Sequence, residues 1–216
     1  KEKSVGDESD WEKAQESLVS AVESLGMQYD IDEGGGAFYG PKIDIKIKDA
    51  IGREWQCSTI QFDFNLPERF DMTYIDNNGN KARPFMVHRA IFGSLERFLG
   101  VLIEHYSGKF PLWLSSNQVK ILCLSDQIVD YCKNIQHQMS KSGLKVQLDS
   151  SSEKLGYKIK RASEEKVPYM LIVGKRDKEN GVVSVRKRGD GDIGQMDIES
   201  FINLISKDSQ IPRVVL

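Results

Sequence analysis

The sequence has no hydrophobic run that approaches the roughly 20 residues needed to span a membrane. Its first residues, KEKSVGDESDWEKAQ, contain no apolar segment of the kind that directs secretion. Cysteine is scarce, with three residues at Cys57, Cys123 and Cys132 and no CxxC spacing, so we expect neither a disulfide framework nor a cysteine zinc knuckle. These absences exclude a membrane protein and favour a cytoplasmic protein whose reduced thiols lie in strands or in the core.

The remaining composition is that of an ordinary globular protein, with 39% apolar and 29% charged residues. A chain of 216 residues can form two small domains, each with its own core. The net charge of −2 is unevenly distributed. Residues 1–36 hold 3 basic and 10 acidic residues, whereas residues 150–190 hold 11 basic and 6 acidic residues. The second segment could therefore contact a polyanion.

The first region is predicted to combine helices with an antiparallel sheet. Apolar residues recur every three or four positions from Trp11 to Leu25, which predicts a helix that ends at Gly26. The alternating sequence IDIKIKD predicts a half-buried strand, with WQCSTIQFDF as its antiparallel partner. A strand at RPFMVHRAIF and a helix from Ser94 follow. The buried face of that helix is predicted to consist of Leu95, Phe98, Leu99, Leu102 and Ile103.

The pattern changes at SGKFPLW, where the domain boundary is predicted between residues 109 and 110. Beyond it, strands and helices alternate, which is typical of βαβ units around a mostly parallel sheet. The predicted strands are QVKILCL, LKVQLD, VPYMLIVG and VVSVRKR. The predicted helices cover residues 125–142 and about 153–165, with a last helix from Asp197. The overall prediction is an α/β (α+β) chain.

Two patterns in the first region could carry chemistry, and each has a simpler interpretation. GGGAFYGPK could be a ligand loop, but Lys42 is not followed by Ser or Thr and no helix opens after it, so it is not a P-loop. A tight turn with glycines at positive φ is favoured. His88 could bind zinc, but Cys57 is its only nearby candidate partner, so a hydrogen-bonded strand histidine is favoured.

Two basic positions leave similar alternatives open. Arg97 falls in the first turn of a helix, where the helix dipole disfavours a cation by a few tenths of a kcal/mol. It is either a solvated surface residue or a residue that faces the aromatic plane or phosphates of a ligand. VVSVRKRG is either a charged edge strand or a surface that binds phosphate or nucleotide.

Six segments together resemble the C-terminal part of threonyl-tRNA synthetases, which are class II aminoacyl-tRNA synthetases. They are GAFYGPKIDIKIKD, REWQCSTIQFDFNLPERF, VHRAIFGSLERFLGVLIE, FPLWL, VPYMLIVG and VVSVRKRG, in the family's order and spacing. The resemblance implies that residues 1–109 are the end of the class II catalytic domain, including its motif 3. Residues 110–216 would be an α/β anticodon-binding domain with a mixed, mostly parallel five-stranded sheet and three helices.

The same resemblance assigns roles to individual residues. Arg97 matches the motif 3 arginine, which packs on the adenine of ATP, and the ATP-binding residues would be Lys42, Gln56 and Arg97, with Lys42 and Arg97 catalytic. The threonine-binding residues would be Tyr39, Thr59, Gln61 and Ala90, and His88 would be one ligand of a zinc ion that binds the amino and hydroxyl groups of threonine. The residues facing the anticodon would be Ser152, Lys154, Lys160, Asp177 and Arg186. Ser58, Ser152 and Lys160 depart from the Gly, Asn and Arg expected at those positions.

The function that this resemblance implies is that of a threonine–tRNA ligase, which forms threonyl adenylate from ATP and threonine with Mg²⁺ and transfers threonine to its tRNA. Motif 1, which builds the homodimer, and motif 2, with the zinc Cys and first His, are expected before Lys1. The chain is therefore expected to be a fragment that is inactive alone. The alternative is a non-catalytic tRNA-binding paralogue or regulator, and the sequence preceding Lys1 would distinguish the two.

Overall fold

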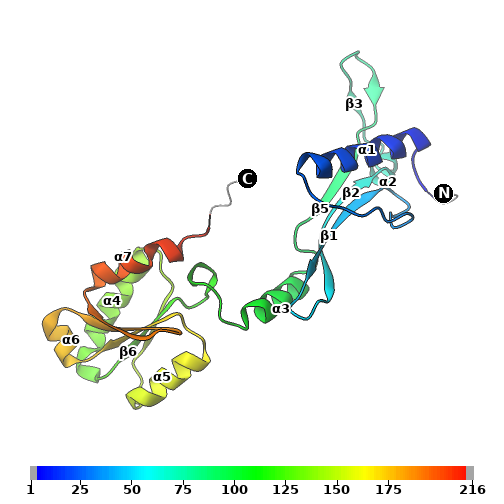
Figure 1. The fold of residues 1–216 in the computed structure, drawn as a ribbon. Helices are drawn as coiled ribbons and strands as arrows, with labels where there is room; N and C mark the ends of the chain where they lie inside the picture. The colour runs from blue at the N-terminus through cyan, green and yellow to red at the C-terminus, as the bar shows by residue number, and fades with distance from the viewer. Residues whose placement is uncertain (1–3, 213–216) are drawn as a thin grey trace. The chain divides into compact units, whose positions relative to one another are not determined.

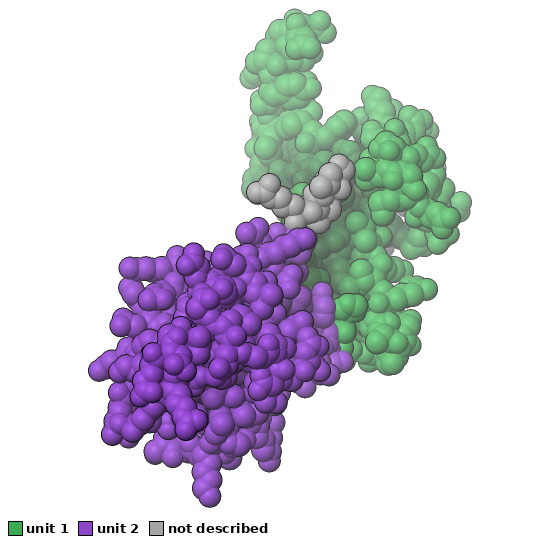
Figure 2. Space-filling view, turned by 60° about the vertical axis from the view of Figure 1, so that its left-hand side comes forward, with its two compact units in different colours: residues 1–105 green, residues 106–216 purple. Residues whose placement is uncertain are grey.

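A computed structural model describes residues 4–212 and divides the chain into two compact units, Lys1–His105 and Tyr106–Leu216 (Figures 1 and 2). The division falls four residues before the predicted boundary. Within residues 4–212, no helix is long and apolar enough to cross a membrane. The two units are described separately below.

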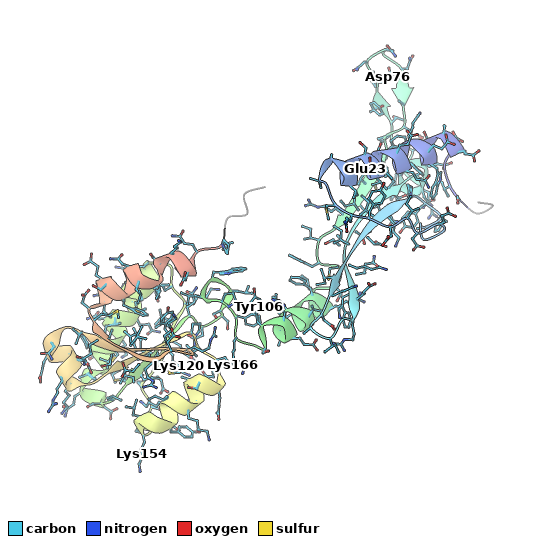
Figure 3. The ribbon with its side chains drawn as sticks, in the orientation of Figure 1. Glu23, Asp76, Tyr106, Lys120, Lys154 and Lys166 are labelled. Atoms are coloured by element: carbon cyan, nitrogen blue, oxygen red, sulfur yellow. The ribbon has the colours of Figure 1, made fainter. Side chains whose placement is uncertain are left out.

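Unit 1 consists of a three-stranded antiparallel sheet with helices before and after it. Its strand order is β1-β2-β5, and β3 and β4 form a separate small hairpin whose turn is closed by Asp76 (Figure 3). The elements are α1 (Glu8–Ser24), β1 (Lys42–Lys48), β2 (Glu54–Asp63), α2 (Asn65–Arg69), β3 (Tyr74–Ile75), β4 (Lys81–Ala82), β5 (Met86–Ala90) and α3 (Leu95–Tyr106). The helix before Gly26 and the antiparallel strands are confirmed.

The predicted buried face of α3 is wrong for this chain. No residue of α3 is buried, and Leu95, Leu99 and Ile103 are 67%, 52% and 45% exposed. The apolar stripe has helical spacing, as predicted, but the described part of unit 1 places too few elements against it to exclude water. Other large apolar residues of unit 1, such as Phe70 and Ile75, are exposed as well.

Unit 2 is a five-stranded mixed sheet with helices on both faces (Figure 1). The elements are η1 (Leu112–Leu114), β6 (Val119–Cys123), η2 (Asp126–Ile128), α4 (Val129–Lys141), β7 (Val146–Asp149), α5 (Leu155–Glu164), β8 (Tyr169–Val173), α6 (Lys175–Asn180), β9 (Val183–Lys187), β10 (Gly191–Met196) and α7 (Ile198–Ser209). The strand order is β10-β9-β8-β6-β7. The mixed sheet is confirmed, and α6 is a short helix in a segment predicted as a loop.

The sheet is mostly parallel in strand direction, as predicted. Strand β6 pairs in parallel with β7 and β8, and β9 pairs antiparallel with both β8 and β10, so that β9 alone runs opposite to the other four strands of this sheet. The unpredicted strand β10 supplies one of the two antiparallel pairs. It also gives β9 a neighbour on each side. The interpretation of VVSVRKRG as an edge strand is therefore wrong.

The core of unit 2 lies on both faces of this sheet. Helices α4 and α7 cover one face, where alternate residues of β6, β8 and β9 form the main cluster with residues such as Met139 and Phe201. Helix α5 covers part of the other face through Ala162, which packs with Leu122 and Met170. Cys57, Cys123 and Cys132 are free and buried, which confirms the prediction of unpaired thiols in the core or in strands.

Candidate active site and nucleic-acid interface

The loop before β1 is held against the end of β2 by its backbone. The amide of Phe64 donates to the carbonyl of Tyr39 at 2.8 Å, and that of Phe62 donates to Pro41 at 3.0 Å. A Cβ on Gly40 would lie 2.0 Å from the carbonyl oxygen of Phe62, so only glycine fits there. Of the loop's glycines, Gly34 has positive φ, as the tight-turn interpretation expects, whereas Gly40 is required by the close approach of Phe62.

The strand register places most of the predicted site residues on one face of the sheet. Lys42 of β1 lies opposite Gln61 of β2, which lies opposite His88 of β5. The next row along the strands contains Asp44, Thr59 and Ala90. Because directly opposed residues of antiparallel strands point to the same side, these six side chains share a surface, which we call the site face.

A β-bulge brings Gln56 onto the site face. The register shifts between Ile45 and Lys46, so that Cys57 is the additional residue on β2 and Gln56 lies opposite Lys46. Gly93, with φ of 64°, approaches this bulge closely, since a Cβ on it would lie 3.0 Å from the carbonyl oxygen of Cys57. An uninterrupted strand would have directed Gln56 to the opposite side of the sheet.

Asp44 is the centre of the hydrogen bonds on the site face. Its Oδ1 accepts from Gln56 Nε2 at 2.6 Å and from Thr59 Oγ1 at 2.8 Å, and its Oδ2 pairs with Lys42 Nζ. Gln56 Nε2 also donates to Thr59 Oγ1 at 2.9 Å. These contacts bring Lys42, Gln56 and Thr59 together around one carboxylate.

Gln61 leaves a polar group without a partner on the same face. Its Oε1 accepts a hydrogen bond from Tyr39 Oη at 3.2 Å. Its Nε2 is buried and has no hydrogen-bond partner among the residues that the structure describes. Such groups are rare in proteins because an unmade buried hydrogen bond is costly, so an acceptor from a ligand is a natural partner for this amide.

His88 is oriented by a buried carboxylate. Its Nε2 lies 2.8 Å from Asp63 Oδ2, and Asp63 is only 4% exposed. Burial tends to raise the pKa of Asp63, but hydrogen bonds from the Leu66 amide, His88 and the Asn65 amide outweigh it, and the pKa is lowered. The carboxylate therefore remains charged and fixes one ring nitrogen of His88, which leaves Nδ1 as the available ligand atom.

Arg97 lies in the first turn of α3, as predicted, and its side chain is exposed. The helix start is held by Ser94, whose hydroxyl accepts from the Arg97 amide at 3.3 Å and donates to Glu96 at 2.8 Å. Within the part of the chain that the structure describes, the Arg97 guanidinium forms no ion pair, so it is available to a ligand. A cavity of about 230 Å³ in unit 1 lies elsewhere, beside residues such as Asp49 and Phe98.

In unit 2, Arg186 lies on the face of the sheet that carries α5. It is directly opposite Met170 of β8, which packs toward α5, and opposite Asp192 of β10. Figure 1 shows α5 on one side of the sheet and α4 and α7 on the other. We call the side with α5 and the half-buried Ser184 and Arg186 the α5 face.

Ser152, Lys154 and Lys160 are exposed at or near α5, on the same side as Arg186. Lys154 is the residue that precedes α5 and lies on the outside of the unit (Figure 3). The loop that carries Ser152 is anchored by Asp149, which is 6% exposed. Burial opposes its charge, but hydrogen bonds from Ser151 and Arg161 outweigh that effect and lower its pKa.

Asp177 differs from these residues because its carboxylate is used inside the unit. It is 8% exposed, accepts from the Gly174 amide at 2.7 Å, and also bonds Ser184 Oγ and Gln195 Nε2 at 3.2 and 3.0 Å. These contacts join the start of α6 to β9 and β10. Asp177 is thus placed to hold the α5 face in shape, with both carboxylate oxygens already engaged.

Comparison with known families divides the chain as the fold does. Residues 4–106 match the tRNA synthetase class II core domain (G, H, P, S and T), and residues 118–208 match the anticodon binding domain. The threonine–tRNA ligase of Clostridioides difficile (strain 630) is 53% identical over 207 residues, which cover 96% of this chain and 32% of that protein. The chain belongs to the threonyl-tRNA synthetase family.

Other members of the threonyl-tRNA synthetase family agree in sequence and in fold. The threonine–tRNA ligase of Finegoldia magna is 54% identical over 97% of this chain and 33% of its own length. The RNA binding domain of threonyl-tRNA synthetase from Cryptosporidium parvum Iowa II superposes with a TM-score of 0.85, at 36% identity over 97% of this chain and 53% of that chain. The chain spans about a third of the length of the curated relatives it matches.

Sequence reasoning missed two carboxylates of unit 1, those of Asp44 and Asp63. Both lie inside predicted strands, where an acidic residue is normally interpreted as part of the solvent-exposed face of the strand. Their positions opposite or beside Thr59 and His88 become visible only with the register of β1, β2 and β5. A search for acidic residues opposite a predicted site residue could have found Asp44, whereas Asp63 lies opposite Met86, two residues before His88 on β5.

Proposed function

We propose that this chain acts within a threonine–tRNA ligase, where unit 1 supplies part of the site for ATP and threonine and unit 2 recognises the anticodon. The observation that carries the proposal is the site face, where Tyr39, Lys42, Gln56, Thr59 and Gln61 are joined by hydrogen bonds to one another or to Asp44. Within this face lies the buried Gln61 Nε2, which has no hydrogen-bond partner among residues 4–212. Buried polar groups are usually hydrogen-bonded, so this free donor beside the other predicted site residues supports a ligand at the site face.

The reaction proposed is attack by the threonine carboxylate on the α-phosphate of ATP, followed by transfer of threonine to the tRNA. No covalent enzyme nucleophile is required, so this chain contributes by binding and charge stabilisation. Arg97 would stack its guanidinium on the adenine, and Lys42 would face the phosphates, which enter with Mg²⁺. Tyr39, Thr59 and Gln61 would bind threonine and the accepting end of the tRNA, and Ala90 leaves space beside them.

The residues present also fit a zinc ion. A histidine that binds a metal through one ring nitrogen usually donates a hydrogen bond from the other to a carboxylate, and Asp63 provides that carboxylate for His88. Within residues 4–212 no group of three His, Cys, Asp or Glu residues gathers, so the remaining ligands would come from other parts of the longer protein. When bound, the zinc would act as a Lewis acid that holds the amino and hydroxyl groups of threonine.

In unit 2 we propose that the α5 face binds the anticodon through Ser152, Lys154, Lys160 and Arg186, with Asp177 holding that face in shape. Single-stranded bases can be read by hydrogen bonds to their edges, for which a planar guanidinium such as that of Arg186 is well suited. The family further implies a cytoplasmic enzyme that forms a homodimer. The cytoplasmic location and the homodimer are part of this proposal.

Threonine-dependent ATP–pyrophosphate exchange tests the catalytic part of the proposal. A protein of full family length that contains this sequence should be active, and the 216-residue chain alone should not, because the loss of even one preorganised group typically costs about 10²–10³ in rate. Exchange by the chain alone within about tenfold of the longer protein would contradict this assignment of the chemistry. An inactive longer protein that still binds threonine tRNA would instead identify a non-catalytic tRNA-binding paralogue or regulator.

The zinc proposal is tested by the metal content of His88→Ala in the longer protein. We expect less bound zinc and weaker discrimination against serine and valine, with little change in ATP affinity, because the metal would lie on the amino-acid side of the site. His137→Ala, at an exposed position of α4, is the matched control and should keep its zinc. Full zinc occupancy in His88→Ala would remove this residue from the metal site.

A further inference from the structure

Asp44 connects three residues that the family resemblance assigns to substrate binding, although it was not itself among the predicted site residues. Its carboxylate contacts Lys42, Gln56 and Thr59, and its side chain is 20% exposed. Lys42 lies in β1, and Gln56 and Thr59 lie in β2, so the carboxylate joins residues of both strands. We propose that Asp44 is the positioning residue of the site, holding Lys42 toward ATP and Gln56 and Thr59 toward their ligands; this inference rests on the proposed function.

The chemistry of a carboxylate suits this task. It can accept about four hydrogen bonds through two oxygens, and here Oδ1 takes the two neutral donors while Oδ2 takes the ammonium group. A lysine side chain has many rotamers, and a charge-assisted bond at its end fixes one of them before ATP arrives. The contacts therefore reduce the ordering that the site must undergo when substrate binds.

The strand geometry explains why a carboxylate at position 44, and not at a neighbouring position of β1, can contact all three residues. Asp44 lies directly opposite Thr59, and the bulge at Cys57 brings Gln56 to the same face. Lys42 is two residues before Asp44 on the same strand, so its side chain emerges on the same side. A carboxylate one residue earlier or later on β1 would point to the opposite face and reach none of the three partners.

A second carboxylate on the same hairpin provides a matched control. Asp49, near the β1–β2 turn, accepts from Trp55 Nε1 at 2.9 Å and from the amides of Ile51 and Arg53 at 3.1 and 2.8 Å, and it pairs with the Arg53 side chain. It thus has as many partners as Asp44, but none of them is a predicted site residue. Asp49 stabilises the turn, and its loss reports a purely structural effect.

The test compares D44N with D49N in a protein of full family length that contains this sequence, by ATP–pyrophosphate exchange and by thermal unfolding. Asparagine keeps the shape of Asp44 and an oxygen for Thr59, but it loses the charge that holds Lys42. We expect D44N to lower kcat by about 10²-fold, as for other misplaced catalytic groups, with a nearly unchanged KM for threonine and unfolding midpoint. D49N should lower the unfolding midpoint and leave kcat close to that of the unmutated protein.

A double-mutant cycle with Lys42→Met distinguishes positioning from general damage. If Asp44 acts through Lys42, the double variant should be about as slow as Lys42→Met alone, because residues that act as a unit are not additive. The inference would be overturned if the losses in kcat of the two single variants multiplied in the double variant. It would also be overturned if D44N lowered the unfolding midpoint as much as D49N does and lowered kcat no more than D49N. An inactive unmutated protein would overturn the proposed function with it, whereas normal activity in D44N would overturn this inference alone.

Discussion

Unit 2 buries its apolar side chains on both faces of its sheet, while unit 1 leaves many of its own on the surface. In unit 2, residues of α4, α7, β6, β8 and β9 with little or no exposure form one continuous cluster. In unit 1, Phe70, Leu95 and Ile75 are 68%, 67% and 62% exposed, and only a few of the apolar residues that the structure describes there, such as Leu18 and Phe64, are buried. Burial of apolar surface is the main driving force for folding, so the two units differ in what stabilises them.

The two proposed binding surfaces therefore differ in the core that supports them. The α5 face of unit 2 belongs to a sheet whose core is complete, and the match to an anticodon binding domain covers residues 118–208. The site face of unit 1 lies on a small sheet with exposed apolar neighbours, of the kind that marks an interaction surface. Since the matched segment is about a third of the curated relatives, those proteins have further chain that can cover such a surface.

The largest expected effect concerns the separated units. Residues 106–216 should unfold in one cooperative transition in urea, because their core is closed. Residues 1–105 alone should show no such transition, because a three-stranded sheet with an uncovered apolar face gains too little burial to offset the loss of chain entropy. Circular dichroism and tryptophan fluorescence of the two pieces check this. Equal stability of the two pieces would contradict the claim that unit 2 has a closed core and unit 1 does not.

A smaller effect is expected from truncating neighbouring residues of α7. Ile205 is fully buried and should cost about 2–5 kcal/mol on substitution by alanine, since the change leaves a cavity in the core. Leu204, the adjacent residue, is 52% exposed and should cost about 0.5 kcal/mol or less. Urea unfolding of residues 106–216 carrying each substitution measures both values. Similar costs at the two positions would show that the core is looser than the burial indicates.

The sequence predicted elements with a clear hydrophobic period and missed those without one. Alternation in IDIKIKD and helical spacing from Trp11 to Leu25 correspond to β1 and α1. The sequence of β10, GDIGQM, has neither pattern, and the one buried residue of α6 is Asp177. Such elements form because neighbouring strands and hydrogen bonds hold them, which a local pattern does not report.

The candidate site was predictable as a set of residues, but its internal connections were not. The family resemblance pointed to Lys42, Gln56 and Thr59, and the strand register brings them together. The bulge at Cys57 and the role of Asp44 depend on pairing between two strands, for which the sequence gives no local signal. Asp177 matched a family position, yet the structure shows its carboxylate occupied by internal bonds.

The most direct test of the division into two units is tRNA binding by residues 106–216 alone, measured at several salt concentrations. We predict weak, salt-dependent binding that favours threonine tRNA, and a loss of about 1–3 kcal/mol in Arg186→Ala because a base edge loses its bidentate partner. Lys141→Ala removes one charge from α4, on the opposite face, and should have a smaller effect. Equal binding of tRNAs with unrelated anticodons, or equal losses in the two variants, would contradict the assignment of anticodon recognition to the α5 face.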